Sequence, residues 1–340
     1  MLRSVFARVF FAFTVLAVCF SVPMANAAPT VWKVVSNTRN SLQFEKWQWF
    51  AEEVKQRTNG EIACEVISFP ELNLTGAELI RMLNSNLLDV AEVVTGYVSG
   101  DAPALEAAQI TGSFRDYRHN QAGYEAFLPV VKERYSRIIG GIPVGSFSFG
   151  PMHVWTRFPV NSPSDMKGKK IRVFSVSQAD YLQAMGAEGV FIPLADMYVA
   201  LERGLVDGTI TGAESAAGQK LWEVTKHVTE MRFGAGAGFV VISRKSYEGI
   251  SDKNKAIVDK LFEEINARGW DIGQEDSDLG IQKARDHGMT VNIESNPEWE
   301  PALVEMAKTV VVPRWTERAG KGSKELFNQV IAPVVGFEIK

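Results

Sequence analysis

The chain alternates strand-like and helix-like segments from residue 31 onward, and this alternation constrains the fold more than any other feature. Short apolar runs typical of strands occupy residues 31–35, 62–69 and 89–94. Between them, apolar residues recur at helical spacing over 44–54 and 76–86, and Asn59-Gly60 is typical of a helix C-terminus. This order predicts an α/β fold in which helices cover both faces of a parallel sheet.

A second unit with the same rhythm begins near Gly150. Its predicted elements are a strand at 170–174, helices at 178–185 and 196–203, and a strand at 209–211. Ser251 then caps a long helical segment that reaches His287 and that Gly269 and Gly273 are expected to interrupt. Residues 300–331 are again largely helical by pattern, so we expect two domains.

The N-terminal residues have the layout of a secretory signal peptide. Arg3 and Arg8 precede an apolar run over residues 9–20, and Ala25-Asn26-Ala27 provides small residues for cleavage. The apolar run is shorter than the roughly 20 residues that a membrane-spanning helix needs. We therefore predict that residues 1–27 are removed, that the mature chain starts at Ala28, and that the protein is periplasmic.

Charge and cysteine content disfavour several other classes. Cleavage removes two arginines from a chain of formal net charge −4, which leaves −6. This acidic balance offers no basic surface for nucleic acid. Cys19 leaves with the signal peptide, so Cys64 remains alone and no disulfide within the chain is predicted. The mature chain is therefore expected to depend on its hydrophobic core.

The sequence lacks the common motifs for catalysis and cofactor binding. The four histidines, at 119, 153, 227 and 287, lie far apart in the chain, and none belongs to a metal-binding pair. No G-x-S-x-G nucleophile motif occurs. The glycines at 234, 236 and 238 do not have the spacing of a dinucleotide-binding loop. We expect a binding protein with no metal and no cofactor.

Residues 168–208 contain the most informative motif. They begin with Gly-Lys-Lys-Ile-Arg-Val at 168–173 and end with Asp-Met-Tyr-Val-Ala-Leu-Glu-Arg-Gly-Leu-Val-Asp-Gly at 196–208. This pattern resembles the DctP-type solute-binding proteins of tripartite ATP-independent periplasmic (TRAP) transporters. Those proteins carry a G-x-K-x-R strand followed by E-x-Y-x-A-L-x-x-G-x-x-D-G. The likeness extends, in the same order, over nearly the whole mature chain.

The resemblance implies a two-domain periplasmic binding protein of the type II-like class, with a hinged cleft and a long helix that spans both domains. Domain I is expected to comprise residues 28–149 and about 237–276, and domain II residues 150–236 and about 277–340. A small molecule would bind in the cleft and be delivered to the small and large membrane subunits of the transporter. The protein is expected to be a monomer or a weak dimer.

Arg172 is the main predicted ligand-binding residue, because the resemblance implies that it holds a ligand carboxylate. A guanidinium group is planar, permanently charged and able to donate two parallel hydrogen bonds. In the predicted strand, Phe174 faces the same side as Arg172. The other residues predicted to line the site are Ser175, Met152, Thr211, Tyr97, Thr95, Phe239 and Leu194.

Two of these positions depart from the family's pattern. Many relatives carry a second arginine where this chain has Met152, and an asparagine where it has Thr211. One charged anchor in an otherwise apolar or aromatic pocket favours a small monocarboxylate with an apolar or aromatic body. A second carboxylate would remain unpaired there, at a cost of a few kcal/mol.

Other functions remain open at this point. An alternative set of residues would cage a small ammonium compound: Tyr97, Phe239, Trp47 and Trp155 with Glu92 or Glu214. The same architecture also serves other transporters and sensors. A periplasmic enzyme on this fold is a further alternative, which the missing catalytic motifs disfavour.

Overall fold

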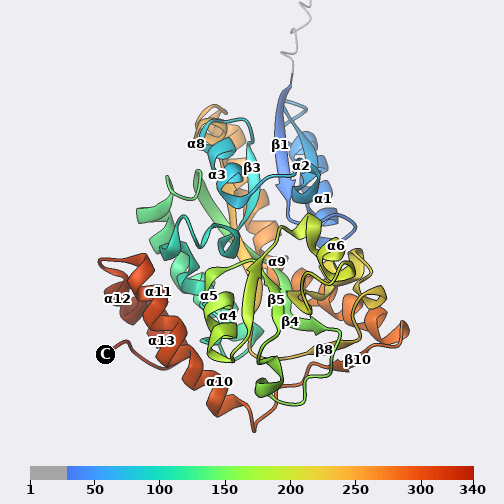
Figure 1. The fold of residues 1–340 in the computed structure, drawn as a ribbon. Helices are drawn as coiled ribbons and strands as arrows, with labels where there is room; N and C mark the ends of the chain where they lie inside the picture. The colour runs from blue at the N-terminus through green and yellow to red at the C-terminus, as the bar shows by residue number, and fades with distance from the viewer. Residues whose placement is uncertain (1–28) are drawn as a thin grey trace, which may run out of the picture.

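The computed structural model describes residues 29–340, in which ten strands form one sheet flanked by helices (Figure 1). The strands are β1 (Thr30–Ser36), β2 (Ile62–Ser68), β3 (Val90–Val94), β4 (Ile142–Thr156), β5 (Lys170–Val173), β6 (Glu188–Phe191), β7 (Gly208–Gly212), β8 (His227–Thr229), β9 (Ala235–Ile242) and β10 (Thr290–Asn292). The helices of the N-terminal two thirds are α1 (Leu42–Arg57), α2 (Phe69–Leu72), α3 (Gly76–Asn84), α4 (Tyr117–Val130), α5 (Val176–Ala184), α6 (Met197–Glu202) and α7 (Ala213–Gly218). Those that follow are α8 (Arg244–Glu248), α9 (Asp252–Asp286), α10 (Glu300–Met306), α11 (Val312–Ala319), α12 (Ser323–Leu326) and α13 (Ala332–Val335).

The predicted βαβαβ start of the chain is confirmed. Strand β1 lies between β2 and β3 and runs parallel to both. Helix α1 begins after Ser41, whose side chain accepts a hydrogen bond from the backbone N–H of Phe44. It ends before Asn59, which has a φ of 53°. Its buried residues include Trp47, Phe50 and Val54, so the apolar stripe read from the sequence faces the core.

The sheet has two halves that strand β4 joins. The strand order is β2-β1-β3-β9-β4-β7-β5-β6, with β8 and β10 attached beside β4. We call β1, β2, β3 and β9 with their helices the first half, and β5, β6 and β7 with theirs the second half. The start of β4 pairs with β9, and its end pairs with β7 and β8. In Figure 1 the first half lies above the second.

The C-terminal helices contact both halves. The indole N–H of Trp315, on α11, donates to the carbonyl of Pro103 in the 3₁₀ helix η2 (Pro103–Gln109), 2.8 Å away. Arg314, also on α11, donates to Asp180 on α5, over 3.1 Å. The domain boundaries predicted from the sequence stay a prediction, since these helices bridge the two parts of the molecule.

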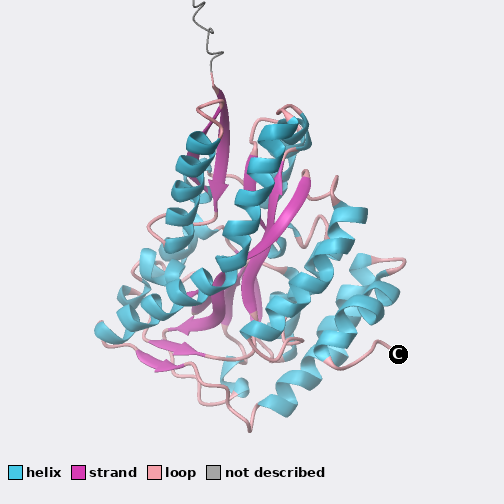
Figure 2. Ribbon diagram, turned by 180° about the vertical axis from the view of Figure 1, so that it is seen from behind, coloured by secondary structure: helices cyan, strands magenta, loops and turns pink. Residues whose placement is uncertain are grey.

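The long helix α9 runs unbroken over Asp252–Asp286, so the predicted interruption at Gly269 and Gly273 is wrong. The helix packs along β4 on the back of the sheet (Figure 2). A Cβ atom on Gly273 would lie 2.3 Å from the carbonyl oxygen of Ser148 in β4. Only glycine permits this close approach, and the packing offsets the roughly 1 kcal/mol by which glycine weakens a helix.

Within residues 29–340, no helix is both long enough and apolar enough to cross a membrane. The predicted signal peptide and its cleavage site lie outside the described residues. Both therefore stay predictions from the sequence.

Candidate functional site

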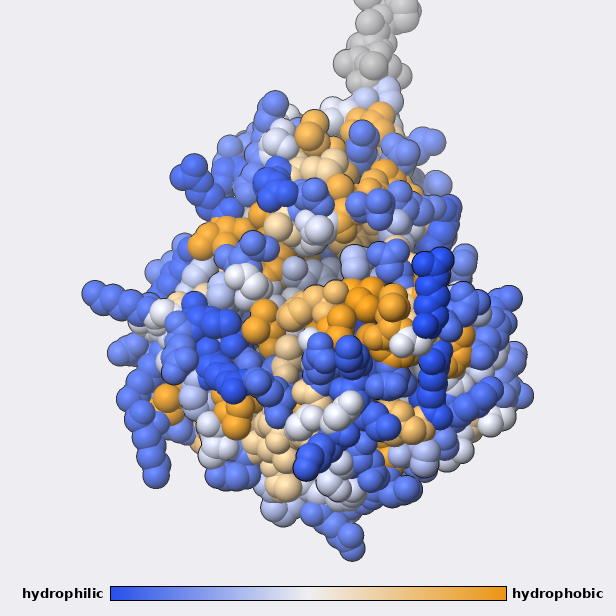
Figure 3. All heavy atoms as spheres, viewed as in Figure 1, coloured by the Kyte–Doolittle hydropathy of each residue, from blue (hydrophilic) through white to orange (hydrophobic). Residues whose placement is uncertain are grey.

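A cavity of about 230 Å³ lies between the two halves of the sheet. The first half contributes residues of the segment 69–76 and Tyr97, and the second half contributes Arg172–Phe174 and the segment 191–195. Most of these side chains are apolar or aromatic. On the face shown in Figure 3, apolar residues gather at the level where the upper and lower parts of the molecule meet. The cavity therefore has the position and lining of a small-molecule site.

Arg172 is the cavity's cation, and it is almost completely buried, with 1% of its surface exposed. Its Nε donates to the carbonyl of Ile192 over 2.8 Å, and its Nη1 donates to the carbonyl of Ile210 over 3.1 Å. Among residues 29–340, no carboxylate forms an ion pair with it. Burial lowers the pKa of Arg172 to about 10, because the charged form loses its hydration. The described part of the chain thus holds a buried positive charge without an anion of its own.

Aromatic rings surround this guanidinium. The Phe174 ring centroid lies 5.4 Å from the guanidinium carbon of Arg172, within the range of a cation–π contact. Tyr97 meets Phe174 edge-on at 5.4 Å between ring centroids and stacks on Phe69 at 5.5 Å. Burial raises the pKa of Tyr97 to about 12, against the opposing effect of the Arg172 charge. The Tyr97 hydroxyl is therefore a neutral donor at physiological pH.

The two halves touch closely beside this aromatic cluster. A Cβ atom on Gly96 would lie 2.8 Å from the Phe174 ring and 3.1 Å from the Cβ of Ser175. Gly96 belongs to the 3₁₀ helix η1 (Thr95–Val98) of the first half, whereas Phe174 follows β5 of the second. A glycine is needed here because any side chain would separate the halves at the edge of the cavity.

Comparison with known proteins settles the family. The sequence pattern of the DctP family, described as "Bacterial extracellular solute-binding protein, family 7", matches residues 34–313. The chain belongs to this family. The resemblance noted from the motif at 168–208 is thereby confirmed.

Named relatives of this family 7 protein bind organic acids. It is 26% identical over 313 residues to the C4-dicarboxylate-binding periplasmic protein DctP of Rhodobacter capsulatus, which covers 87% of this chain and 92% of the relative. It shares its fold with a Bordetella pertussis extracytoplasmic solute receptor that binds pyroglutamic acid, at a TM-score of 0.79, 20% identity and coverage of 89% and 99%. It also shares its fold with a TRAP periplasmic solute-binding protein of Desulfovibrio salexigens that holds orotic acid, at a TM-score of 0.79, 18% identity and coverage of 91% and 99%. Proteins of this kind bind small molecules and work with membrane permease subunits.

Four of the residues predicted for the site line the cavity of this family 7 protein: Arg172, Phe174, Tyr97 and Leu194. Ser175 lies next to them but serves as the N-cap of α5, where its side chain accepts from the N–H of Gln178. The structure thus brings together the charged anchor, two aromatic rings and one aliphatic wall residue.

The other predicted residues lie in the interior, away from the cavity. The Thr95 hydroxyl is 2.6 Å from the hydroxyl of Tyr124, and Phe239 packs against the Tyr124 ring with 5.2 Å between centroids. Met152 is fully buried, with its methyl group over Gly236 and Gly212.

Thr211 pairs with His153 in the sheet. Its carbonyl accepts a hydrogen bond from the Trp155 indole.

Strand β4, which carries Met152, shifts register against β9 between Ser148 and Pro151. Such a shift changes where the side chains that follow it point.

The alternative residue set for an ammonium compound does not converge on the cavity apart from Tyr97. Glu92 already accepts from Lys46 Nζ over 3.0 Å and from the Trp47 indole over 2.8 Å. Glu214 makes no ion pair within residues 29–340, and its Oε2 is buried without a hydrogen-bond partner there. Burial raises the pKa of Glu214 to about 7.

Sequence reasoning missed several residues around the cavity. Phe69, Leu74 and the stretch Phe191–Pro193 line it, although no motif singles them out. Asn37, which directly follows β1 and is 2% exposed, is not among the residues that line this cavity. Both polar atoms of its side-chain amide lack a hydrogen-bond partner among the described residues.

No group of three or more histidine, cysteine, aspartate or glutamate residues suited to a metal ion occurs in the part of the chain that the structure describes. The polar and charged residues that line the cavity are Arg172, Tyr97, Asn73 and Thr75, and the rest of its lining is mainly apolar.

Proposed function

We propose that this family 7 protein is the extracytoplasmic solute-binding subunit of a TRAP transporter, and that it binds a small organic acid in the cavity beside Arg172. The ligand has one carboxylate and an apolar or aromatic body. The protein delivers this ligand to the small and large permease subunits in the membrane. It acts by binding and release, without changing the ligand chemically.

The observation that supports this proposal is the unpaired charge of Arg172. A buried cation without an anion is costly, and a ligand carboxylate would remove that cost on binding. The hydrogen bonds to Ile192 and Ile210 occupy Nε and one hydrogen of Nη1. The second hydrogen of Nη1 and both hydrogens of Nη2 have no hydrogen-bond partner given within the described residues, and a guanidinium group can donate two such hydrogens to the two oxygens of a carboxylate.

The apolar lining supports a single carboxylate. Arg172 is the charged residue among those that line the cavity, and its neighbours there are mainly Phe69, Leu74, Phe174 and Leu194. A second ligand carboxylate would lose water without gaining a cation, which costs roughly 1–3 kcal/mol or more. An aromatic or aliphatic body instead gains about 25 cal/mol for each Å² of apolar surface that it buries.

The experiment is a ligand screen with a matched pair of arginine variants. Mass spectrometry of the purified protein identifies any compound that copurifies. Thermal unfolding and calorimetry then compare L-pyroglutamate, orotate and succinate as probes. We expect a monocarboxylate to raise the melting temperature more than succinate does, and Arg172→Ala to remove the shift. Arg203→Ala, at an exposed position in the second half, should leave it unchanged. Persistence of the shift in Arg172→Ala would overturn the proposal.

A further inference from the structure

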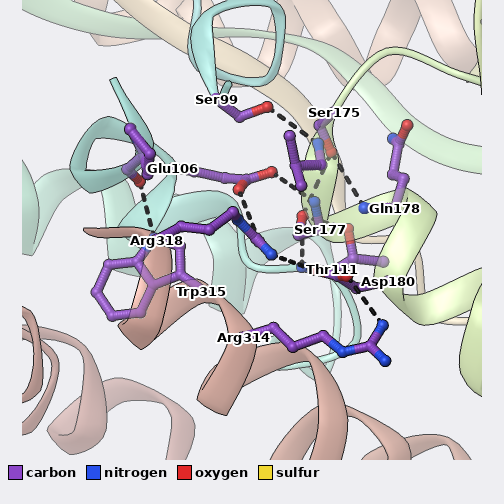
Figure 4. Close-up of polar contacts among 12 residues, drawn as sticks. Ser99, Glu106, Thr111, Ser175, Ser177, Gln178, Asp180, Arg314, Trp315 and Arg318 are labelled. Atoms are coloured by element: carbon purple, nitrogen blue, oxygen red, sulfur yellow. Dashed lines mark hydrogen bonds and ion pairs between the residues drawn. The ribbon is translucent and has the colours of Figure 1, made fainter. Parts of the chain in front are cut away.

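The first turn of α5 is bound to the first half of the molecule through its backbone (Figure 4). The N–H of Val176 donates to the hydroxyl of Ser99 over 3.0 Å, and the N–H of Ser177 donates to Oε1 of Glu106 over 3.1 Å. The Thr111 N–H also donates to the Ser177 hydroxyl over 3.2 Å. The amide groups of Val176 and Ser177 belong to the helix terminus that no intrahelical bond satisfies. The two halves therefore meet through hydrogen bonds at this helix start.

This helix start is directly connected to the ligand cavity. Strand β5 carries Arg172, Phe174 follows it, and Ser175 caps α5. Only four residues separate Arg172 from Ser177 in the chain. A movement of the α5 terminus towards or away from Glu106 therefore shifts the guanidinium relative to Tyr97 on the opposite wall.

Glu106 is completely buried between three elements. Glu106 lies on η2, and its Oε1 accepts a hydrogen bond from the N–H of Ser177 on α5. The Nη2 of Arg318, on α11, lies 3.9 Å from the Oε2 of Glu106. Arg318 also pairs with Asp180 of α5 over 2.5 Å, and Asp180 pairs with Arg314 over 3.1 Å. The cluster thus contains two carboxylates and two guanidinium groups from η2, α5 and α11, as Figure 4 shows.

We propose that Glu106 is a positioning residue for ligand binding: it receives the first turn of α5 when the halves close, and so sets Arg172 against the opposite wall of the cavity. The Arg318 guanidinium lies on the side of the C-terminal helices, with its Nη2 3.9 Å from Glu106 Oε2 and without a hydrogen bond between them. This inference rests on the proposed function, since it concerns closure around the same cavity. A carboxyl oxygen is a suitable acceptor for the free N–H groups of a helix N-terminus, both when the group is ionised and when it is protonated.

The charge state of Glu106 gives this role a pH dependence. Burial raises the pKa of Glu106 to about 7, against the opposing effects of Ser177 and Arg318. Where the halves are apart and water reaches the carboxyl, its pKa returns towards 4.5. The closed arrangement therefore binds a proton more tightly than the open one. Closure is favoured as the pH falls from about 7 towards 4.5, and this advantage is lost as the pH rises through 7.

The test measures closure directly and needs no ligand. Spin labels replace Arg81 on α3 and Arg203 just after α6, two exposed positions in opposite halves, in a Cys64→Ser background. Double electron–electron resonance then measures the distance between the two labels and gives the populations of short and long distances at pH 5.5 and pH 8. In the unsubstituted protein we expect the ratio of the short-distance to the long-distance population to be about 30-fold higher at pH 5.5 than at pH 8.

Two variants of Glu106 distinguish a role in positioning α5 on closure from a role in stability alone. Glu106→Gln keeps the acceptor and the shape but is always neutral, so it should show the low-pH population at both pH values. Glu106→Ala removes the acceptor, so it should lower the short-distance population at both. Glu125→Gln, at an exposed position on α4, should behave like the unsubstituted protein.

Full retention of the pH response in Glu106→Gln would overturn the inference, and so would a distance that stays the same at both pH values in the unsubstituted protein. Glu106→Gln also decides the question if Glu106→Ala fails to fold. These outcomes are independent of the proposed function, which stands or falls with carboxylate binding in Arg172→Ala.

Discussion

Arg172 and Glu92 are both buried charges, one in each half of the molecule, and the protein treats them differently. Glu92 is 2% exposed and is fully provided with partners: Lys46, the Trp47 indole, the Ser36 hydroxyl and the N–H of Asn37. Arg172 is 1% exposed and has two backbone carbonyls but no carboxylate within the described residues. The first charge is neutralised by Lys46, whereas the second has no anion within the described residues.

This difference separates the two ligand classes that the sequence left open. A cation-binding site at Glu92 would have to displace Lys46, which already occupies one of its oxygens. Glu214, the other acidic candidate, lacks an internal cation among the described residues, but its pKa of about 7 means that it is largely protonated in mildly acidic solution. Arg172 keeps its charge over this whole range. The comparison therefore favours an anionic ligand.

The largest expected effect is on stability, at the charge that is paired internally. Glu92→Leu leaves Lys46 buried without an anion, so we expect the free energy of unfolding to fall by about 3–5 kcal/mol. Urea unfolding followed by circular dichroism measures this change. The double variant Lys46→Met with Glu92→Leu should recover part of the loss. Glu52→Leu, at an exposed position of α1, should change stability little; a loss of similar size there would refute this interpretation.

The second-largest expected effect is on ligand affinity, and it depends on the planar geometry of the Arg172 guanidinium. Arg172→Lys keeps the positive charge but loses the planar fork, so one of two parallel hydrogen bonds to a carboxylate is lost. We expect affinity for the best-binding monocarboxylate of the screen to fall by about 10–100-fold. Calorimetry measures it directly. Lys170→Arg, at an exposed position of the same strand, is the matched control and should bind as the unsubstituted protein does. Unchanged affinity in Arg172→Lys would contradict bidentate binding.

The sequence predicted well what depends on local pattern. The strand of residues 170–173 was found, and strand alternation together with the family motif placed Arg172 and Phe174 on one side. The apolar residues that recur at helical spacing over 44–54 lie on the buried face of α1. Such features are encoded within a short stretch of chain.

What the sequence did not predict depends on contacts between distant segments. Phe69 and Leu74 line the same cavity as Arg172 although about 100 residues separate them from it in the chain, and no periodicity in the sequence indicates that arrangement. The position of Met152 depends on a register shift in β4, which no residue pattern announced. Gly273 was expected to interrupt α9, because its close contact with Ser148 is invisible until β4 is placed beside the helix.

A smaller effect should appear at Glu214, the buried carboxyl that has no internal cation within residues 29–340. Its pKa is raised in the folded protein above the ordinary value of 4.5, so the folded state binds this proton more tightly than the unfolded state. Its contribution to stability is fully present below about pH 4.5 and is lost as the pH rises through about 7. Between pH 5 and pH 8, we expect the free energy of unfolding of the unsubstituted protein to fall by roughly 1–3 kcal/mol more than that of Glu214→Gln.

Urea unfolding at pH 5, 6.5 and 8 measures the contribution of Glu214. Glu106 adds a contribution of the same sign, but it is present in both proteins and cancels in the comparison. Glu202→Gln, at an exposed position of α6, is the matched control and should follow the unsubstituted protein. Parallel pH profiles for Glu214→Gln and the unsubstituted protein would show that Glu214 is ionised in the folded state.

The smallest expected effect tests the comparison most directly. Arg172→Met removes a buried charge that has no anion among the described residues, so the gain from not burying the charge should offset the two lost hydrogen bonds to Ile192 and Ile210. Without ligand, we expect the free energy of unfolding to change by less than about 1 kcal/mol, against the much larger loss in Glu92→Leu. Carboxylate binding should nevertheless be abolished. If Arg172→Met instead destabilised the ligand-free protein as strongly as Glu92→Leu, Arg172 would be a structural residue, and its charge would not be held for a ligand.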